Sequence, residues 1–360
     1  MLFLQLMQNT LSLLSWYQKH KRDLPWRQTK NPYYIWLSEV ILQQTRVEQG
    51  MPYYFKFVEQ FPTVNHLAQA PIDEVLKLWQ GLGYYSRAKN LHETAKQVVA
   101  QYQGLFPESF EQLIQLKGIG DYTASAISSI AFQEKQAVVD GNVFRVLARF
   151  YGIETPIQSS KAKKEFKTLA NDLLIDGQNP GQINQGLMEL GSQICTPKNP
   201  KCAACPWQTN CYAFAHQKQA EFPVKLAKKA SKKVYLHYFF LKQNQSFLLC
   251  KRDQSSIWKG LYQPLLIESN TELQLPPLDE LARLLEIKPN QLFVTKPTDS
   301  IVHLLTHRKL IVTFYIVTSK SKKLSIPSQF QLFNWDELQT LPFPIVIARF
   351  IDQYQSLLID

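Results

Sequence analysis

The sequence predicts two domains, an all-α domain followed by an α+β domain. A chain of 360 residues exceeds what one hydrophobic core usually organises. The hydrophobic periodicity is helical in the first part and strand-like in the last, and a lysine-rich stretch at 223–233 separates the two. We therefore place the first domain at residues 1–216, a basic linker at 217–233 and the second domain at 234–360.

The first domain shows helical spacing from residue 2 to about residue 216. A segment near its middle is typical: Pro71 can open a helix, and Ile72, Val75, Leu76 and Trp79 follow at intervals of one helical face. Similar segments recur between Gly and Pro residues, so we expect helices joined by short turns.

The second domain carries β-branched and aromatic runs of strand length. These predicted strands lie at 233–241, 245–252, 309–318 and 328–335. Helix-like segments lie at 278–285 and 348–358, which makes the second domain α+β.

Composition limits the class of protein. The hydrophobic share of 45% and the aromatic share of 12% exclude a disordered chain. No apolar run is long enough to span a bilayer, and residues 1–14 lack the basic start of a signal peptide, so we expect a soluble, unsecreted protein with no membrane partner. A net charge of +11 favours a polyanionic partner such as nucleic acid.

Four of the five cysteines form a cluster. Cys195, Cys202, Cys205 and Cys211 have the spacing C-x6-C-x2-C-x5-C in a turn-rich segment. Four thiolates can hold a tetrahedral zinc ion or a [4Fe-4S] cluster. Zinc ribbons usually show two close cysteine pairs and only one is present here, which favours the cluster without excluding zinc. Cys250, in the apolar run at 247–250, is expected to be a buried core thiol.

Two further segments allow both a structural and a functional interpretation. Gly118 and Gly120, in LKGIG before a helical run, can form a turn whose N–H groups hold a DNA phosphate, or a simple helix connection. Asp140 precedes Gly141 and an amphipathic helix, and locally the favoured role for it is a helix N-cap.

Taken together and in this order, the LKGIG hairpin, the aspartate of VVDGN and the cysteine loop resemble the helix-hairpin-helix base-excision glycosylases with an iron-sulfur cluster. LPWR at 24–27, NPYYIWLSEVILQQTRV at 31–47 and WQGLGYYSRAKNLH at 79–92 are similar to the adenine DNA glycosylases of the MutY type. The resemblance covers residues 11–215 closely and the remainder loosely. It implies a [4Fe-4S] cofactor and a Nudix-like second domain.

The resemblance also assigns the chemistry. Cleavage of an adenine glycosidic bond needs an acid on the base and a carboxylate near the cationic sugar. Glu39 matches the acid that protonates adenine N7 and then activates water; by itself it would be interpreted as a solvated carboxylate on a helix opened by Asn31 and Pro32. Gln43 and Val47 follow Glu39 at i+4 steps, which predicts one continuous helix face. Asp140 matches the residue that stabilises the sugar cation.

Tyr122 stands where endonuclease III, a bifunctional relative, carries a lysine able to form a Schiff base. The sequence therefore predicts a monofunctional glycosylase that leaves an abasic site. In the family the matching tyrosine, with Asn142, supports the charged centre; the alternative is that Tyr122 only packs in the hairpin.

The resemblance implies base flipping, because a base inside a duplex is out of reach. Gln43, Gln44 and Tyr84 match residues that wedge between bases. The residues that match walls of the adenine pocket are Trp26, Arg27, Leu42, Val47, Gln185 and Met188, and for the apolar ones ordinary core packing is the alternative. Arg87 can contact a phosphate or be a solvated helix charge.

The second domain resembles the one that recognises 8-oxoguanine opposite the adenine. Leu305, Thr306 and His307 fall where the family has a Phe-Ser-His loop, and Leu305 departs from that pattern. The glutamate-dense helix of a Nudix hydrolase is missing after Gly260, which argues against a pyrophosphatase. A DNA-binding protein without catalysis is the other alternative, and retention of both carboxylates argues against it.

These matches predict a monomeric enzyme whose partner is double-stranded DNA with adenine opposite 8-oxoguanine or guanine. We expect it in the cytoplasm with the nucleoid, because no targeting segment is visible.

Overall fold

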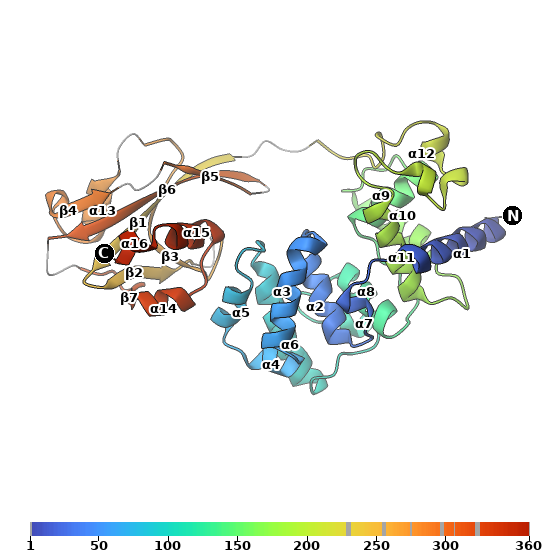
Figure 1. Cartoon of the computed structure of the whole chain (residues 1–360), viewed down its shortest axis with the longest axis horizontal. Coiled ribbons are helices and arrows are strands. Elements are labelled where there is room, and N and C mark those ends of the chain that lie inside the picture. Colours follow the sequence, from blue (N-terminus) through green and yellow to red (C-terminus); the bar gives the residue numbers. More distant parts are fainter. Residues whose placement is uncertain are drawn as a thin grey trace. The chain divides into compact units, whose positions relative to one another are not determined.

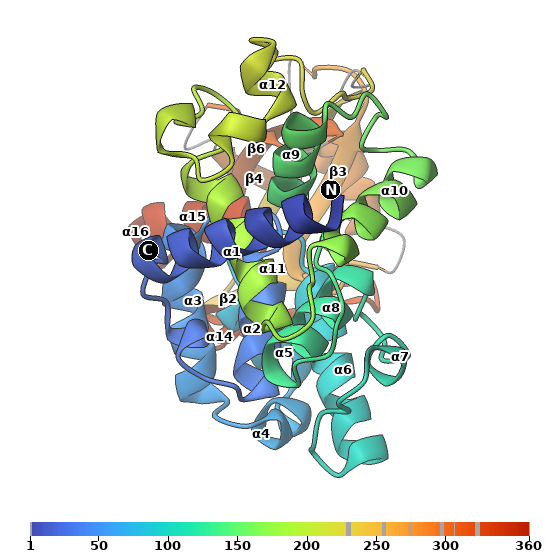
Figure 2. The ribbon, with the colours of Figure 1, turned by 90° about the vertical axis from the view of Figure 1, so that its right-hand side faces the viewer.

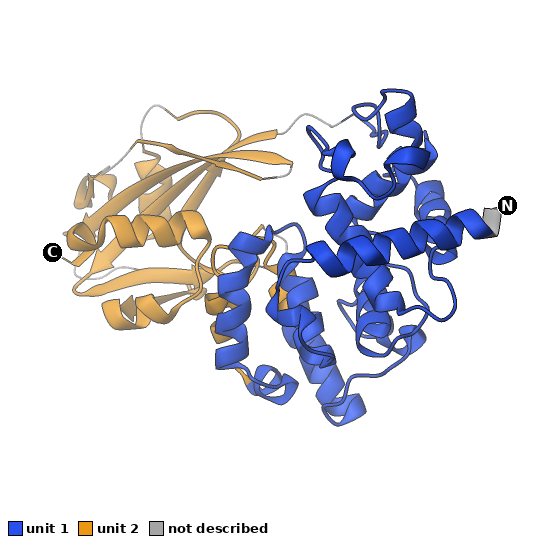
Figure 3. Cartoon of the chain, turned by 45° about the vertical axis from the view of Figure 1, so that its right-hand side comes forward, with its two compact units in different colours: residues 1–69, 90–227 blue, residues 70–89, 228–360 orange. Residues whose placement is uncertain are grey.

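The structure, a computed structural model, describes residues 2–227, 232–253, 257–273, 276–295, 299–305, 307–320 and 325–359 (Figure 1). It divides into two compact units (Figure 3). The helical unit comprises Met1–Gln69 and Asn90–Ala227, and the sheet unit comprises Ala70–Lys89 and Lys228–Asp360. The predicted domains were continuous in sequence, whereas here residues 70–89 group with the C-terminal part of the chain.

The helical unit consists of helices joined by short turns. Its α-helices are α1 (Leu2–His20), α2 (Pro32–Leu42), α3 (Val47–Gln60), α4 (Val64–Gln69), α6 (Ser86–Tyr102, of which the first residues lie in the other unit), α7 (Phe110–Leu113), α8 (Asp121–Ala131), α9 (Gly141–Tyr151), α10 (Ser160–Asp172), α11 (Pro180–Gln193) and α12 (Tyr212–Ala215). Short 3-10 turns are η1 (Pro25–Arg27), η2 (Cys202–Ala204) and η3 (Gln208–Asn210). No described helix combines the length and apolar character needed to cross a bilayer.

Helix α11 is central to one core of this unit. It packs against α1, α8 and α9, and Figure 2 shows α1 crossing it. Leu13 and Tyr17 of α1, Leu147 of α9 and Leu187 of α11 are buried together in this core. Because α11 contacts three helices from distant parts of the sequence, it fixes their side chains relative to one another.

Part of the predicted basic linker at 217–233 packs on the helical unit. Phe222 is buried in the same core as α11, and the Ile157 N–H donates to the Val224 carbonyl (3.1 Å). Strand β1 already begins at Lys232. The lysine-rich composition of this segment gave no sign that Phe222 packs in the core of the helical unit.

The sheet unit contains a mixed sheet with strand order β4-β6-β1-β3-β2-β7, and β5 pairs with β6. The strands are β1 (Lys232–Gln243), β2 (Ser246–Lys251), β3 (Tyr262–Ser269), β4 (Leu292–Thr295), β5 (Ile301–Leu304), β6 (Arg308–Ser319) and β7 (Phe330–Asn334). Its helices are α5 (Ile72–Leu78), α13 (Leu278–Leu284), α14 (Trp335–Thr340), α15 (Ile345–Gln353) and α16 (Gln355–Ile359), with a 3-10 turn η4 (Pro289–Gln291).

Both faces of this sheet are covered. Along β1, Tyr238 and Phe240 join a core that includes Phe350 of α15, while Phe239 and Leu241 join a second core that includes Leu281 of α13. Successive residues of a strand point to opposite faces, so a run that is apolar without alternation is expected when both faces are buried. Cys250 is buried in β2, as predicted.

Sequence analysis missed β3, β4 and β5. Strand β3 pairs with both β1 and β2 although it contains Pro264, which lies opposite Leu249. Proline within an apolar run argues against a central strand, and this one is an exception. Strands β4 and β5 have only 4 residues each, too few to show alternation.

Residues 70–89 contact the rest of the sheet unit through polar groups. The Lys251 ammonium pairs with Asp73 (2.8 Å), and the Phe343 N–H donates to Gln80 Oε1 (3.0 Å). Lys77 Nζ donates to the Leu341 carbonyl (3.1 Å). These contacts join α5 and Gln80 to β2 and to the segment between α14 and α15.

The packing of α11 on α8 generates a stability prediction. A Cβ at Gly181 would lie 2.7 Å from the Ser129 carbonyl oxygen and 2.8 Å from Ile130 Cα, both backbone atoms. We expect Gly181→Ala to lower the free energy of unfolding by about 1–3 kcal/mol, measured by chemical denaturation. Gly141→Ala is the matched control, because a Cβ there meets nothing within 4 Å, and its effect should stay within about 0.5 kcal/mol. Equal effects of the two changes would contradict the close-approach argument.

Candidate active site

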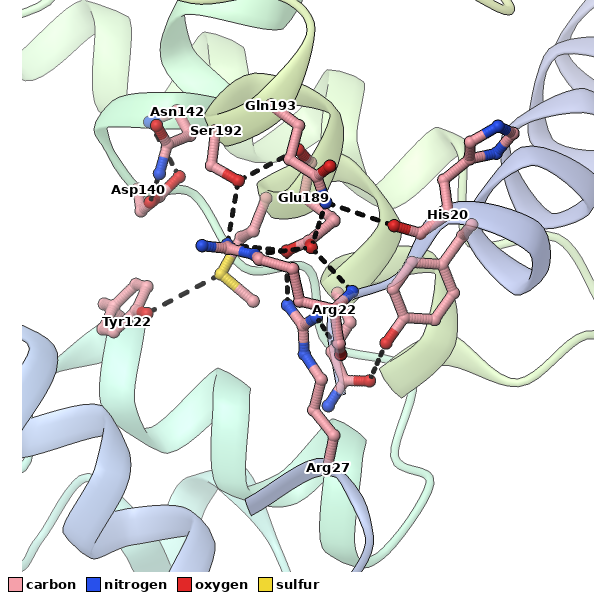
Figure 4. Close-up of polar contacts among 12 residues, drawn as sticks. His20, Arg22, Arg27, Tyr122, Asp140, Asn142, Glu189, Ser192 and Gln193 are labelled. Carbon is pink, nitrogen blue, oxygen red and sulfur yellow. Dashed lines mark hydrogen bonds and ion pairs between the residues drawn. The ribbon is translucent and has the colours of Figure 1, made fainter. Parts of the chain in front are cut away.

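The site begins with a carboxyl on a buried helix. The Asn31 side chain caps α2 by accepting from the Tyr33 N–H, and Pro32 occupies the first turn. Helix α2 packs against α8, and Glu39, only 9% exposed, accepts a hydrogen bond at Oε2 from the Tyr122 hydroxyl. The same hydroxyl lies 3.7 Å from Met188 Sδ (Figure 4). Glu39 is therefore a buried, partnered carboxyl and not a solvated one.

Burial changes the protonation of this pair. It raises the pKa of the Glu39 carboxyl to about 7, and the nearby charge of Asp140 acts in the same direction, while the Tyr122 hydrogen bond and the charge of Arg27 oppose it. Burial and the two carboxylates hold the pKa of Tyr122 well above its usual value. At neutral pH Glu39 can thus carry a proton to donate, and the phenol of Tyr122 stays neutral.

Asp140 is an N-cap and a neighbour of this pair at the same time. Its Oδ1 accepts from the N–H groups of Asn142 (2.9 Å) and Val143 (2.8 Å), and its Oδ2 accepts from Asn142 Nδ2 (2.7 Å). Burial raises the pKa of Asp140, and these hydrogen bonds oppose the rise. The capping role expected from the local sequence is confirmed, and the charge of this half-buried carboxyl acts on Glu39.

Two arginines of α9 connect this region to the cysteine loop. Arg145 donates to Asn142 Oδ1 (2.8 Å), to the Gly191 carbonyl (2.7 Å) and to the Cys195 carbonyl (2.6 Å). Arg149 donates to the Thr196 carbonyl (2.8 Å) and to Cys195 Sγ (3.4 Å). Helix α9 therefore positions Asp140 at its start and the loop along its length.

The cysteine loop fits an iron-sulfur cluster by its donor set. Cys202 opens η2, Cys205 ends it, and Cys211 lies between η3 and α12, so short turns bring the thiols together. Burial raises the pKa of Cys205 to about 12, and the other three thiols add to that rise. Among the described residues, no three His, Cys, Asp or Glu side chains are grouped as around a single metal ion. The four cysteines would hold the cluster, which organises the loop when bound.

One geometric prediction was wrong. Gln43 and Val47 do not continue the face of Glu39, because α2 ends at Leu42 and α3 begins at Val47. Gln44 has a φ of 55°, a left-handed conformation that a helix cannot contain. Gln43 Nε2 instead donates to Thr123 Oγ1 (3.3 Å), next to Tyr122, and Gln44 is exposed at the turn. Leu42 and Val47 are half-buried on either side of this turn.

The LKGIG segment forms a tight turn before α8. Gly118 has a φ of 87°, and a Cβ there would lie 2.5 Å from Asn90 Cβ, so only glycine fits. Gly120 is the N-cap of α8, and a Cβ there would meet nothing within 4 Å. The turn leaves the first N–H groups of an 11-residue helix open, which suits an anion.

The remaining residues predicted for the adenine pocket lie around α11 and η1. Trp26 is buried edge-on to Tyr54 (5.0 Å between ring centroids), and Arg27 pairs with Glu189 (2.7 Å). Gln185 accepts a hydrogen bond from the Tyr17 hydroxyl (2.6 Å). Sequence analysis missed Glu189, although it adjoins Met188 on α11 and is fully buried. A glutamate inside an apolar helical stretch was the signal available.

Two predicted DNA-contacting residues belong to the sheet unit. Tyr84 is half exposed and has a φ of 48°. The Arg87 guanidinium lies 5.0 Å from the centroid of the Trp79 ring and 5.9 Å from that of Tyr84, and it donates to the Gly83 carbonyl (3.3 Å). Arg87 is therefore not a simple solvated charge, because it supports the turn that presents Tyr84.

The predicted recognition loop is only partly described. Leu305 is half-buried against the core beneath α15, and its N–H donates to the Arg308 carbonyl (2.8 Å). His307 is exposed, and Thr306 lies outside the described residues. Leu304, at the end of β5, is 71% exposed. The exposed aliphatic side chain of this loop is therefore Leu304 and not Leu305, the residue predicted to lie against the DNA.

Comparisons with known proteins agree with this geometry. Residues 37–172 match the HhH-GPD superfamily of base excision DNA repair proteins, residues 195–211 the iron-sulfur binding domain of endonuclease III, and residues 237–353 the NUDIX domain. An adenine DNA glycosylase of Buchnera aphidicola subsp. Baizongia pistaciae (strain Bp) is 33% identical over 352 residues, which is 96% of each chain. The chain belongs to the adenine DNA glycosylase family.

A second curated relative and one solved structure are also similar to this chain. An adenine DNA glycosylase of Buchnera aphidicola subsp. Acyrthosiphon pisum (strain APS) is 39% identical over 69% of this chain and 71% of its own. A solved structure of a thermostable thymine-DNA glycosylase is 29% identical and aligns with a TM-score of 0.51, covering 57% of this chain and 95% of its own. The chain is thus a DNA glycosylase of base excision repair, with the predicted helix-hairpin-helix domain, iron-sulfur cofactor and Nudix-like domain confirmed.

The raised pKa of Glu39 predicts a pH-dependent stability. Folding raises the pKa of Glu39 from 4.5 to about 7. The resulting contribution to the free energy of unfolding is complete below pH 4.5 and is lost as the pH rises through 7. We expect Glu39→Gln to be as stable as wild type in acid and about 3 kcal/mol more stable at alkaline pH, by denaturation across a pH series. Glu59→Gln, at an exposed position of α3, is the control. A difference between Glu39→Gln and wild type that does not vary with pH would contradict the burial argument.

The cysteine loop predicts metal content. Protein purified without oxygen should contain about four irons per chain and essentially no zinc, measured by elemental analysis. Serine at Cys202 should lower the iron content, whereas serine at Cys250, in β2, should leave it unchanged. Zinc in place of iron would mean that the ligands hold a different metal.

Proposed function

We propose that this chain is a monofunctional glycosylase that removes adenine opposite 8-oxoguanine or guanine from duplex DNA, acting as a monomer and leaving an abasic site. The observation that carries the proposal is the buried Glu39, hydrogen-bonded to Tyr122 and close enough to Asp140 for the charge of Asp140 to raise its pKa. The names of the relatives support adenine as the base.

The two carboxyls have complementary tasks in this reaction. Glu39 delivers its proton to adenine N7 as the bond between N9 and the sugar breaks, so that the bonding electrons leave with a neutral base. The sugar becomes cationic, and the carboxylate of Asp140 stabilises it. Water then adds to the sugar carbon, and Glu39, now a carboxylate, accepts the proton that the water releases.

The residue at 122 decides whether the strand is also cut. A lyase needs an amine that can form a Schiff base with the sugar. Tyr122 offers a phenol whose hydrogen is committed to Glu39. Lys117 is exposed in the hairpin before Tyr122 and does not occupy the position of that residue. The reaction therefore ends at the abasic site.

We assign contacts with the DNA backbone and with the gap left by the flipped base to two groups of residues. Gly118 and Gly120 present N–H groups for a phosphate, and Gln43, Gln44 and Tyr84 fill the space left by the flipped base. Exposure of Gln44 and of the Tyr84 ring supports this role.

We assign reading of 8-oxoguanine to the sheet unit. His307 is exposed and can hydrogen-bond a base edge. Leu305 is half-buried against the core, whereas Leu304 is 71% exposed, so we assign the apolar contact of this loop to Leu304.

The deciding measurement uses a duplex with one adenine opposite 8-oxoguanine. After incubation each sample is divided, one half is treated with hot alkali, and the strands are sized. We expect strand cuts only after alkali treatment, because the DNA strand breaks at an abasic site under alkaline conditions. Cuts without alkali would make the enzyme a lyase, and intact strands in both halves would contradict the proposal.

Asp140→Asn separates catalysis from binding. The amide can still cap α9 but cannot stabilise a cation, so DNA binding should persist while base release falls by about 100-fold or more. Unchanged base release would remove Asp140 from the mechanism.

A further inference from the structure

Glu189 lies at the centre of a buried polar cluster (Figure 4). Its Oε1 accepts from Arg22 Nε (2.8 Å), the Arg22 N–H (3.1 Å) and Gln193 Nε2. Its Oε2 accepts from Arg27 Nη2 (2.7 Å) and Arg22 Nη2 (2.9 Å). Both oxygens are saturated, so the carboxylate can hold two guanidinium groups in one orientation.

This carboxylate is ionised at any ordinary pH. Burial alone would raise the pKa of Glu189, but hydrogen bonds from Arg22 and Arg27 outweigh burial and lower that pKa to about 2. Tyr17 is the other titratable group beside it. Glu189 therefore acts as a fixed negative charge.

The cluster adjoins the catalytic pair. Met188, the residue before Glu189, contacts the Tyr122 hydroxyl. Arg27 has its side chain only 11% exposed, and its charge reaches Glu39 strongly enough to lower the pKa of that carboxyl. Arg22 is 35% exposed and is not among the groups that act on Glu39.

We propose that Glu189 is a positioning residue that fixes the Arg27 guanidinium beside Glu39 and balances its charge there. The inference rests on the proposed function, because it concerns the same base-release reaction. Arg27 Nη1 also donates to the Arg22 carbonyl (3.3 Å), which restricts the guanidinium further. Glu39 then keeps its proton because the neighbouring cation is neutralised.

The charges around Glu39 determine the sign of each effect. They come from Arg27 of η1, Tyr122 of α8 and Asp140 at the start of α9. Removal of the Glu189 charge leaves Arg27 without a counter-ion, which favours the Glu39 carboxylate. Removal of Arg27 has the opposite effect. A purely structural role for the cluster predicts neither shift.

The test measures single-turnover adenine release from an adenine·8-oxoguanine duplex as a function of pH. For Glu189→Gln we expect a rate about tenfold lower at neutral pH, comparable with the loss of one charge-assisted hydrogen bond, and a basic limb moved to lower pH. For Arg27→Gln, in which Glu189 keeps Arg22, we expect a lower rate and a basic limb moved to higher pH.

Two controls separate charge from shape. Glu189→Asp keeps the charge but shortens the reach, so its basic limb should stay at the wild-type pH although its rate falls. Arg22→Gln removes the other charged partner of Glu189 and should also leave the basic limb in place. Thermal unfolding and the visible absorbance of the cluster verify that each variant is folded and loaded.

The outcomes are distinct. Opposite shifts for Glu189→Gln and Arg27→Gln support the inference. An unchanged basic limb in both variants, or shifts in the same direction, would overturn it while leaving wild-type adenine release intact. If Glu189→Gln does not fold, the shift of the basic limb in Arg27→Gln alone decides between the positioning role and a purely structural role of the cluster. Failure of the wild-type protein to release adenine would instead contradict the proposed function.

Discussion

The site depends on the burial of one carboxyl group in a helical core. Glu39 faces Tyr122 across the contact between α2 and α8, with the charge of Asp140 nearby. Water would stabilise the ionised form of an exposed glutamate, whereas in this position the proton is retained to about pH 7. The acid is thus produced by packing, and every helix that excludes water from Glu39 contributes to the chemistry.

Helices α9 and α11 turn this local property into a defined geometry. The first N–H groups of α9 hold Asp140, and its arginines hold the backbone of the cysteine loop. Helix α11 carries Met188 toward Tyr122 and Glu189 toward Arg27. Contacts between residues far apart in the sequence therefore set the distances within the site, and the cysteine loop is held by the same helix as the carboxylate.

The sequence was informative where one segment carries both the residue and its support. The cap at Asp140, the turn at Gly118 and the buried thiol of Cys250 depend on neighbours a few residues away or on an apolar run. It failed where a distant partner decides. Pro264 lies in a strand because β1 and β2 flank it, and Glu189 is paired with residues more than 160 positions earlier.

Asp140 and Glu189 show why a structural and a functional role need not compete. Capping orients the Asp140 carboxylate, and the same hydrogen bonds oppose the rise of its pKa that burial causes. A buried ion pair such as Arg27 with Glu189 contributes little net stability, because desolvation offsets most of the attraction. Its main consequence is a fixed orientation of the guanidinium. If the enzyme holds a flipped base against a protonated Glu39, as we propose, fixed orientation is what the reaction requires.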